Sequence, residues 1–362
     1  MSFVTKAASP QASIRIGGPR YDVLMAALCG VFQAGAYLDL WAHVHRPELE
    51  SFFTPWHAVL YSGFLAVAAA TSAPLLLRRR PGVPWSRALT PGYDWSLIGA
   101  LAFVLGGVLD MLWHTFLGVE VDVEALLSPS HLILALGSTL MLTGPLRAAW
   151  RRASEARASW AAVLSLTYLL SALTFWTQYA HHLGRPWAAA GNRPTAAAFP
   201  VVAPDPLFRG VEIQTVFVAH ALGVASILLQ ASLLAGIVLI AVWRWGAAFP
   251  PGAFAVVFGL NALAVGVARD QYALVAPAIA AGVITDIVVR LLRPSRARPL
   301  ALRTVAFVAP AAYFALFFVG LAATRGVWWS APLWSGTIVL AGTAGWLLSW
   351  LMAPPTVHGE AA

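Results

Sequence analysis

The sequence is poor in cysteine and in charged residues, and each shortage excludes a class of protein. Its 362 residues include one cysteine, Cys29, so no disulfide framework can form within the chain. Zinc fingers and iron–sulfur centres that need several thiolates are excluded as well. Charged residues make up 10% of the chain, against about 25% in soluble domains, and hydrophobic residues make up 59%. This composition is typical of a polytopic membrane protein.

Motifs of nucleotide chemistry are missing too. The chain has no G-x-x-x-x-G-K-[ST] phosphate loop and no G-x-G-x-x-G turn that opens a helix after a strand. No Ser/His/Asp arrangement stands out. The first residues lack a signal-peptide cleavage pattern and are expected to form a basic tail. The net charge of +8 comes mainly from arginines in short loops, which indicates membrane orientation and not nucleic-acid binding.

The apolar runs predict an all-α membrane bundle of about ten transmembrane helices, since one span needs about 20 apolar residues. Spans seven and eight are separated only by Arg269 and Asp270. The predicted spans cover residues 21–45, 55–77, 93–117, 129–149, 158–182, 212–243, 251–268, 271–292, 301–324 and 333–352.

The distribution of basic residues predicts the orientation. Most of the 23 Lys and Arg residues fall on one side of the predicted spans, together with both termini. The positive-inside rule makes that side the cytoplasm of a plasma or inner membrane. Every histidine except His358 then lies at the outer face, where most acidic residues also gather. We therefore expect an outward-facing polar cluster built by the first six helices.

One sequence pattern occurs twice in the chain. Gly35 to Gly63 and Gly106 to Gly137 both read G-x-x-L-D-x-x-x-H, a short acidic loop, and E-x-x-x-[ST]-P-x-H-x-x-x-x-x-G. An Asp and a His four apart share one helix face, and Ser or Thr before Pro is typical of a helix start with the hydroxyl as N-cap. Each copy predicts a helical hairpin. The matched residues are Asp39 with Asp110, His43 with His114, Glu50 with Glu124, and His57 with His131.

A third, degenerate hairpin is expected over residues 158–243. Its loop is long and rich in Pro, Gly and Ala, and we expect it to fold over the polar cluster as a lid. Its polar residues are Thr177 or Gln178 in the place of Asp, then His181, His182, Glu212 and His220.

The last four spans carry no histidine and are expected to form a scaffold. Asp286 is expected to pair with Arg290 one turn on, with a functional intramembrane carboxylate as the alternative. The predicted organisation is a cytoplasmic tail over 1–20, a six-helix site-bearing region over 21–245 with hairpins 21–77, 93–149 and 158–243, a four-helix region over 246–352, and a tail over 353–362.

Imidazoles and carboxylates together are ligands for copper, zinc or non-haem iron. The aspartates could be ligands themselves or acceptors that fix the imidazole tautomer. The predicted metal ligands are Asp39, His43, His57, Asp110, His114, His131, His181, His182 and His220, with Glu50, Glu124 and Glu212 as further ligands or orienting groups.

Other roles for the same residues stay open. Asp/His pairs relay protons in transporters, or they can join helix ends as plain hydrogen-bonded pins. A bis-histidine haem is disfavoured by the carboxylates. His45 is not repeated, and we expect it to be a water-exposed residue beside the interfacial tryptophans.

The run D-x-x-W-H followed by S-P-S-H, from Asp110 to His131, resembles the copper-binding hairpin of the membrane C subunit of particulate methane and ammonia monooxygenases. In that family the Asp and the two His of the hairpin bind copper. The resemblance implies copper ligands at Asp110, His114 and His131, and in the first copy at Asp39, His43 and His57.

This chain departs from that family in several ways. The Asp is further from the last His, the loop acid stands elsewhere, the motif occurs twice, and there are more spans. The resemblance thus implies copper, with zinc or iron as alternatives, and does not imply hydroxylation. We expect a membrane protein that acquires copper, delivers it, or acts as a monooxygenase-like subunit. Whether it is itself an enzyme stays open. Its expected partners are the bilayer and a membrane subunit or copper enzyme, and not nucleic acid.

Overall fold

The structure is a computed structural model that describes residues 17–46, 53–78, 89–118, 122–152, 157–194 and 206–354. Over these ranges the chain is helical, and its only β-bridges are two isolated ones. Seven helices there are long and apolar enough to cross a membrane, or eight if a bent pair counts as one span. The predicted class of helical membrane bundle therefore holds, whereas the orientation of the termini stays a prediction.

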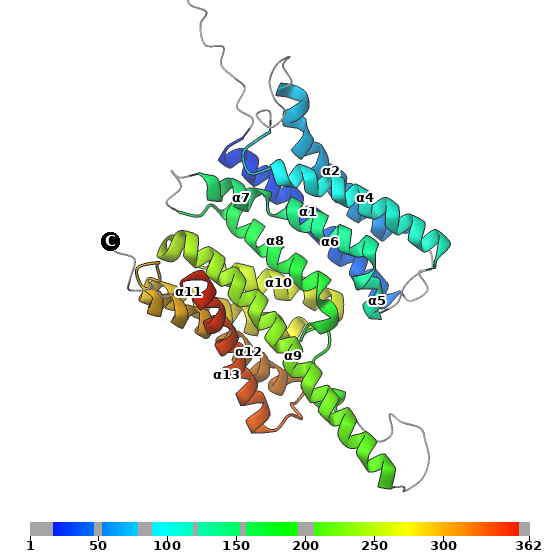
Figure 1. Cartoon of the computed structure of the whole chain (residues 1–362), viewed down its shortest axis with the longest axis vertical. Helices are drawn as coiled ribbons and strands as arrows, with labels where there is room; N and C mark the ends of the chain where they lie inside the picture. Colours follow the sequence, from blue (N-terminus) through cyan, green and yellow to red (C-terminus); the bar gives the residue numbers. More distant parts are fainter. Residues whose placement is uncertain are drawn as a thin grey trace, which may run out of the picture.

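The order of the helices along the chain can be followed in Figure 1, where the longest connection joins α8 to α9. Their bounds are α1 Pro19–His45, α2 Pro55–Arg78, α4 Asp94–Phe116, α5 Asp122–Leu127, α6 Pro129–Leu142, α7 Gly144–Arg151, α8 Trp160–Trp176, α9 Pro206–Trp245, α10 Ala253–Arg269, α11 Val275–Leu292, α12 Pro299–Thr324 and α13 Ala331–Met352.

Three of the ten predicted spans differ from the helices observed. The span predicted over 129–149 is bent by 42° between α6 and α7. The span predicted over 158–182 ends early, since α8 stops at Trp176, and α10 also has only 17 residues. Both α8 and α10 are apolar but, at 17 residues, are shorter than the roughly 20 residues of a usual span. Ten full-length spans are therefore not confirmed.

Side chains satisfy the backbone at the bend between α6 and α7. A bend of this kind leaves carbonyls without helical partners. Ser96 Oγ donates to the Leu140 carbonyl at 3.3 Å, and Arg147 Nη2 donates to the same carbonyl at 2.9 Å. Ser165 Oγ donates to the Leu142 carbonyl at 2.6 Å. Irregular backbone at membrane depth is tolerated where protein groups satisfy it in this way.

The hairpins α1–α2 and α4–α6 close through glycines at corresponding positions. A Cβ on Gly63 would lie 2.7 Å from Phe32 Cα, and a Cβ on Gly137 would lie 2.7 Å from the Phe103 backbone nitrogen. Each glycine thus lets the second helix of its hairpin approach the backbone of the first. The rings of Phe32 and Phe103 meet edge to face with centroids 5.2 Å apart. The two hairpins therefore contact each other through residues at matched positions.

The third predicted hairpin packs differently. Helix α8 packs mainly against α1 and α10, whereas α9 packs mainly against α13 and α12. The largest hydrophobic core therefore joins α8 and α9 to α10–α13, and a second core lies mostly among α1, α2, α4 and α6 (Figure 1). The packing thus groups α8 and α9 with the last four helices, and the predicted division at residue 245 stays a prediction.

Asp286 caps a neighbouring helix and does not form the predicted ion pair with Arg290. The Asp286 carboxylate accepts the backbone N–H groups of Phe254 at 3.4 Å and Ala255 at 3.2 Å, at the start of α10. Arg290 Nη2 instead donates to the Phe249 carbonyl at 3.3 Å. The orphan N–H groups and the positive end of the helix dipole explain why a buried carboxylate is stabilised there.

Replacing Asp286 by alanine is expected to destabilise the fold by about 1–2 kcal/mol, as the loss of a helix cap does. Asp286→Asn is the comparison variant, because its single amide oxygen can still accept one of the two N–H groups, whereas alanine accepts neither. We expect the thermal midpoint in detergent to fall more for Asp286→Ala than for Asp286→Asn. Equal midpoints for wild type and Asp286→Ala would contradict the capping role.

Candidate metal centre

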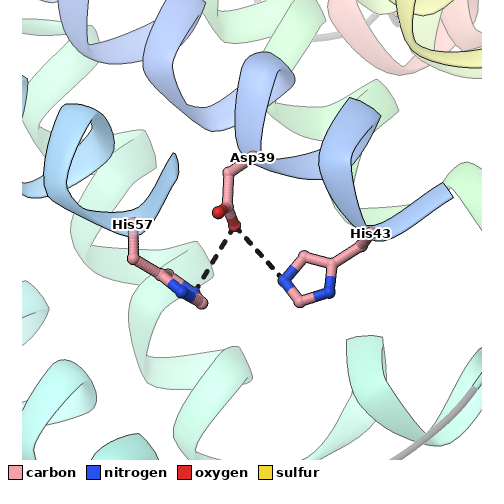
Figure 2. A group of neighbouring side chains, drawn as sticks. All are labelled: Asp39, His43 and His57. Carbon is pink, nitrogen blue, oxygen red and sulfur yellow. Dashed lines mark ion pairs between the residues drawn. The ribbon is translucent and has the colours of Figure 1, made fainter. Parts of the chain in front are cut away.

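The first group of candidate ligands, Site 1, consists of Asp39 and His43 from α1 and His57 from α2. Helical spacing puts Asp39 and His43 on one face of α1, and the start of α2 brings His57 opposite them. His43 Nε2 lies 3.6 Å and His57 Nε2 lies 3.5 Å from the same oxygen, Asp39 Oδ2. Figure 2 shows both imidazoles turned toward this carboxylate.

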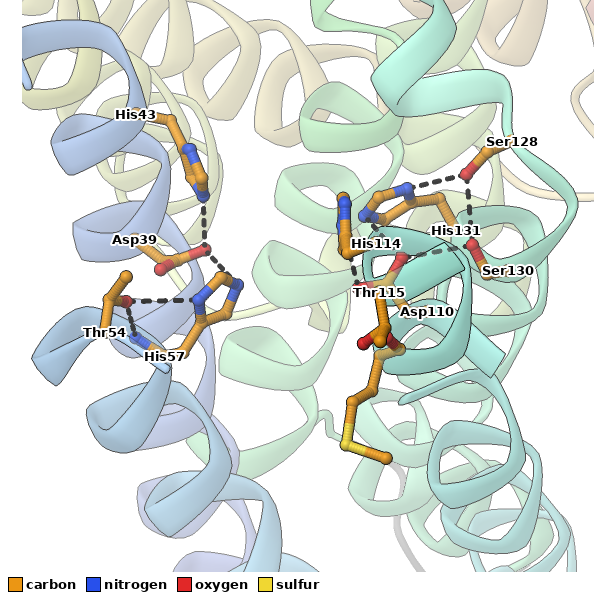
Figure 3. A network of polar contacts seen from close by, with 11 residues as sticks. Asp39, His43, Thr54, His57, Asp110, His114, Thr115, Ser128, Ser130 and His131 are labelled. Carbon is orange, nitrogen blue, oxygen red and sulfur yellow. Dashed lines mark hydrogen bonds and ion pairs between the residues drawn. The ribbon is translucent and has the colours of Figure 1, made fainter. Parts of the chain in front are cut away.

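The second group, Site 2, consists of Asp110 and His114 from α4 and His131 from α6. His114 Nε2 lies 3.5 Å from Asp110 Oδ2, and His131 Nε2 lies 3.5 Å from Asp110 Oδ1. In each site one atom from each of the three residues lies within 4.8 Å of the others. Figure 3 shows the two sites together, with Site 1 on the α1–α2 hairpin and Site 2 on the α4–α6 hairpin.

These separations suit a shared ion better than a direct hydrogen bond. A nitrogen–oxygen hydrogen bond is usually about 2.7–3.2 Å long. Two ligand atoms that each lie about 2.1 Å from a tetrahedral metal are roughly 3.4 Å apart. The observed 3.5–3.6 Å between imidazole nitrogen and carboxylate oxygen is close to the second value.

The second carboxylate oxygen of Site 1 also fits a cation. Asp39 is 8% exposed, and its Oδ1 atom is buried and accepts no hydrogen bond from the described residues. A buried carboxylate oxygen without a donor costs free energy, which a bound cation would offset. The residues of Site 1 therefore fit a metal ion by charge as well as by distance.

The hydroxyl before each helix-start proline contacts the histidine of its own site. Thr54 Oγ1 accepts the His57 backbone N–H at 3.1 Å, as predicted for an N-cap, and lies 3.1 Å from His57 Nδ1. Ser128 Oγ lies 2.8 Å from His131 Nδ1 and forms no cap bond to the backbone. The predicted N-cap is thus confirmed for Thr54 and wrong for Ser128, whose hydroxyl holds the imidazole instead.

A chain of hydroxyls sets the tautomer of His131. An ionised Asp110 only accepts hydrogen bonds, so Ser130 Oγ donates its one proton to Asp110 Oδ1 at 3.1 Å. Ser128 lies 3.1 Å from Ser130 Oγ and must therefore donate to it. Ser128 is then left to accept the Nδ1 proton of His131. In this arrangement a neutral His131 turns an unprotonated Nε2 toward Asp110, so a cation placed between the nitrogen and the carboxylate would stabilise both.

Both sites line one cavity of about 530 Å³. Its walls come from α1, α2, α4, α5, α6, α8 and α10, and its lining is mostly apolar. Tyr61, Arg46 and Arg269 line it as well. The apolar residues among its lining include Phe32, Leu60, Phe103, Leu134 and Phe175.

The three histidines of the third hairpin join neither site among the described residues. His181 Nδ1 accepts the Leu183 backbone N–H at 3.1 Å. His182 lies among aromatic rings of α12, with its centroid 4.8 Å from that of Phe317. His220 stacks on Trp328 with centroids 4.5 Å apart. These residues were predicted as ligands from a hairpin that does not close; the structure buries His181 and His182 and leaves His220 half-buried.

The predicted acidic ligands do not reach the sites in the described part of the chain. Glu124 is exposed on α5 and belongs to neither group of ligands. Glu50 and the Glu212 side chain lie outside the described residues. The start of the predicted lid packs on the α12–α13 connection, where Trp328 Nε1 donates to the Trp187 carbonyl at 2.7 Å, and not over the sites.

His45 makes a contact that the sequence did not suggest. It was expected to be a plain interfacial residue, but its Nε2 lies 2.8 Å from Asp270 Oδ2 and its Nδ1 lies 2.8 Å from the Trp41 carbonyl. Asp270 follows α10 in a left-handed conformation with φ 56°. His45 therefore joins the end of α1, beside Site 1, to the turn between α10 and α11.

Comparison with protein-family models, with curated proteins and with solved structures finds no match. The class of the chain therefore rests on its fold and its site. It is a helical protein suited to a membrane, and it carries two Asp/His/His groups that could hold a metal ion. The likeness to the monooxygenase hairpin stays a prediction.

Proposed function

We propose that this chain is an integral membrane protein that binds and handles copper at the outer membrane face through Site 1 and Site 2. The handling would be acquisition, delivery to a copper enzyme, or service as a monooxygenase-like subunit. The observation that carries the proposal is that His131 Nε2 lies 3.5 Å from a carboxylate oxygen of Asp110, while Nδ1 on the other side of the ring is 2.8 Å from Ser128 Oγ. Two imidazoles and a carboxylate suit copper, zinc and iron, and the resemblance of the motif favours copper.

The same distances weigh against a site that only pins helices together. A structural pin or a proton relay depends on short Asp–His hydrogen bonds, whereas the imidazole–carboxylate separations here are 3.5–3.6 Å. If the carboxylate only joined helices through hydrogen bonds, its buried Oδ1 atom would be expected to accept one. Asp39 Oδ1 accepts none from the described residues.

We further propose that the two hairpins are copies of one unit and that each unit carries one metal site. The matched sequence pattern, the corresponding glycine contacts and the two equivalent ligand sets support this. With both termini in the cytoplasm, the sites would open to the exterior or periplasm.

Metal analysis of the purified protein tests the proposal. Wild type loaded with copper and desalted is expected to retain about two ions per chain, in line with its two ligand sets. His57→Ala and His131→Ala should each retain about one ion, and the double variant none, because each loses one ligand of three. His220→Ala, a histidine outside both sites, is the matched control and should retain both ions. If wild type holds no more copper, zinc or iron than the double variant, the proposal fails.

A further inference from the structure

We infer that the two sites have different parts in metal handling: Site 1 exchanges its ion with the surroundings, and Site 2 retains its ion. The inference rests on the proposed metal binding and adds an order to it. Its basis is that the two ligand sets match in residue type but differ in exposure and in the groups that hold them.

Exposure separates the two sites first. The His43 side chain of Site 1 is 44% exposed, whereas the equivalent His114 of Site 2 is 14% exposed. The aspartates follow the same order, with 11% for the Asp39 side chain and 3% for Asp110. The helix-start histidines are similar, with 16% for His57 and 20% for His131. Protein around a metal site controls the access of solvent and of competing ligands. An incoming chelator or partner can therefore reach an ion in Site 1 more easily than an ion in Site 2.

The residue before each helix-start histidine separates the sites a second time. In Site 2 this residue is Ser130, which donates to Asp110 Oδ1 at 3.1 Å and links the carboxylate through Ser128 to His131. In Site 1 it is Trp56, which has no hydroxyl, and Asp39 Oδ1 has no donor among the described residues. Ligands fixed in advance by such outer partners bind metal more tightly, and loss of one partner typically costs about 10–100-fold in affinity.

The cavity connects the two sites. Residues of both sites line the same space of about 530 Å³, so no helix has to open for an ion to pass from one site to the other. In Figure 3 the two ligand sets face each other, with the more open set on the α1–α2 hairpin. An ion that enters at Site 1 can therefore be transferred to Site 2 and held there.

The rate of metal release tests this inference. The full chain is loaded with Cu²⁺ alone at both sites, mixed with excess EDTA, and followed by stopped-flow absorbance. We expect two phases of about equal amplitude. His43→Ala should remove the fast phase and His114→Ala the slow phase. Ser130→Ala keeps all six ligands and should speed the slow phase about 10–100-fold, as the loss of an outer partner does. Ser62→Ala, which removes a hydroxyl that bonds only the Ala58 carbonyl, is the matched control and should leave both phases unchanged.

The outcomes separate this inference from the proposed function. A chain that loads two ions but releases them in a single phase overturns the inference and leaves metal binding intact. The same holds if His114→Ala removes the fast phase, or if Ser130→Ala leaves the slow phase unchanged. A chain that loads no metal overturns both.

Discussion

Asp39→Asn and Asp110→Asn are each expected to weaken metal binding at their own site by on the order of 100-fold or more, with the other site unchanged. The carboxylate is the one anionic ligand in each set of three. Asparagine keeps its shape but removes the charge, so a divalent ion is left with neutral ligands in a partly buried site, where charge is weakly screened. Competitive titration against a chelator of known affinity would measure the loss at each site.

The stability of the metal-free variants separates ligation from a structural role. Metal-free Asp39→Asn is expected to be at least as stable as metal-free wild type, because it removes a buried charge whose Oδ1 atom has no donor among the described residues. A structural pin predicts the opposite, with a lower thermal midpoint and no effect of metal. The ligand assignment is wrong if Asp39→Asn lowers the midpoint and leaves the chelator titration unchanged.

The sequence was sufficient to find the six residues of the two sites because their placement depends on short-range geometry. Asp39 and His43 lie four residues apart on one helix, and Pro55 starts the next helix two residues before His57. A short loop then leaves the two helix ends beside each other. Ser130 was visible in the S-P-S-H run as well, but its role required knowing that its hydroxyl reaches Asp110.

The structure of the third predicted hairpin could not be derived from short-range sequence patterns. The apolar run predicted one helix through residue 182, but α8 ends at Trp176 and a 3₁₀ turn over Gln178–Ala180 follows. The chain beyond it is held by contacts with α12 and its connection to α13, more than a hundred residues away in sequence. Trp328, for example, donates to the Trp187 carbonyl. Local patterns contain no information about such partners, so the sequence could not show that the histidines there lie apart from the two sites.

Two other features differ in how far local sequence could have revealed them. The run Thr143, Gly144, Pro145 at the bend between α6 and α7 is a recognisable break, because proline removes a helical hydrogen bond and glycine weakens the helix around it. Asp286 was expected to pair within its own helix, since i,i+4 partners are what a sequence displays. Its actual partners are backbone N–H groups of α10, which only the packing of α11 against α10 brings near.

Acid is expected to release metal from both sites steeply. Each site needs two neutral imidazoles, so metal and protons compete for the same nitrogen atoms. Below the pKa that each imidazole has in the metal-free protein, each unit of pH lowers the affinity about tenfold per histidine, or about 100-fold per site once both histidines titrate. Protonation favours the metal-free form, so affinity is full above that pKa and is lost as the pH falls.

The slope of the logarithm of Kd against pH is the quantity that checks this. His114→Ala isolates Site 1, and His43→Ala isolates Site 2, so each intact site can be titrated alone. We expect a slope near two for each, since two imidazoles lose their protons when the ion binds. A slope near one would mean that only one histidine of that site binds the ion. A flat profile over a pH range in which NMR shows the imidazoles of the metal-free protein to be protonated would exclude imidazole ligation, because the metal and the proton compete for the same nitrogen atoms.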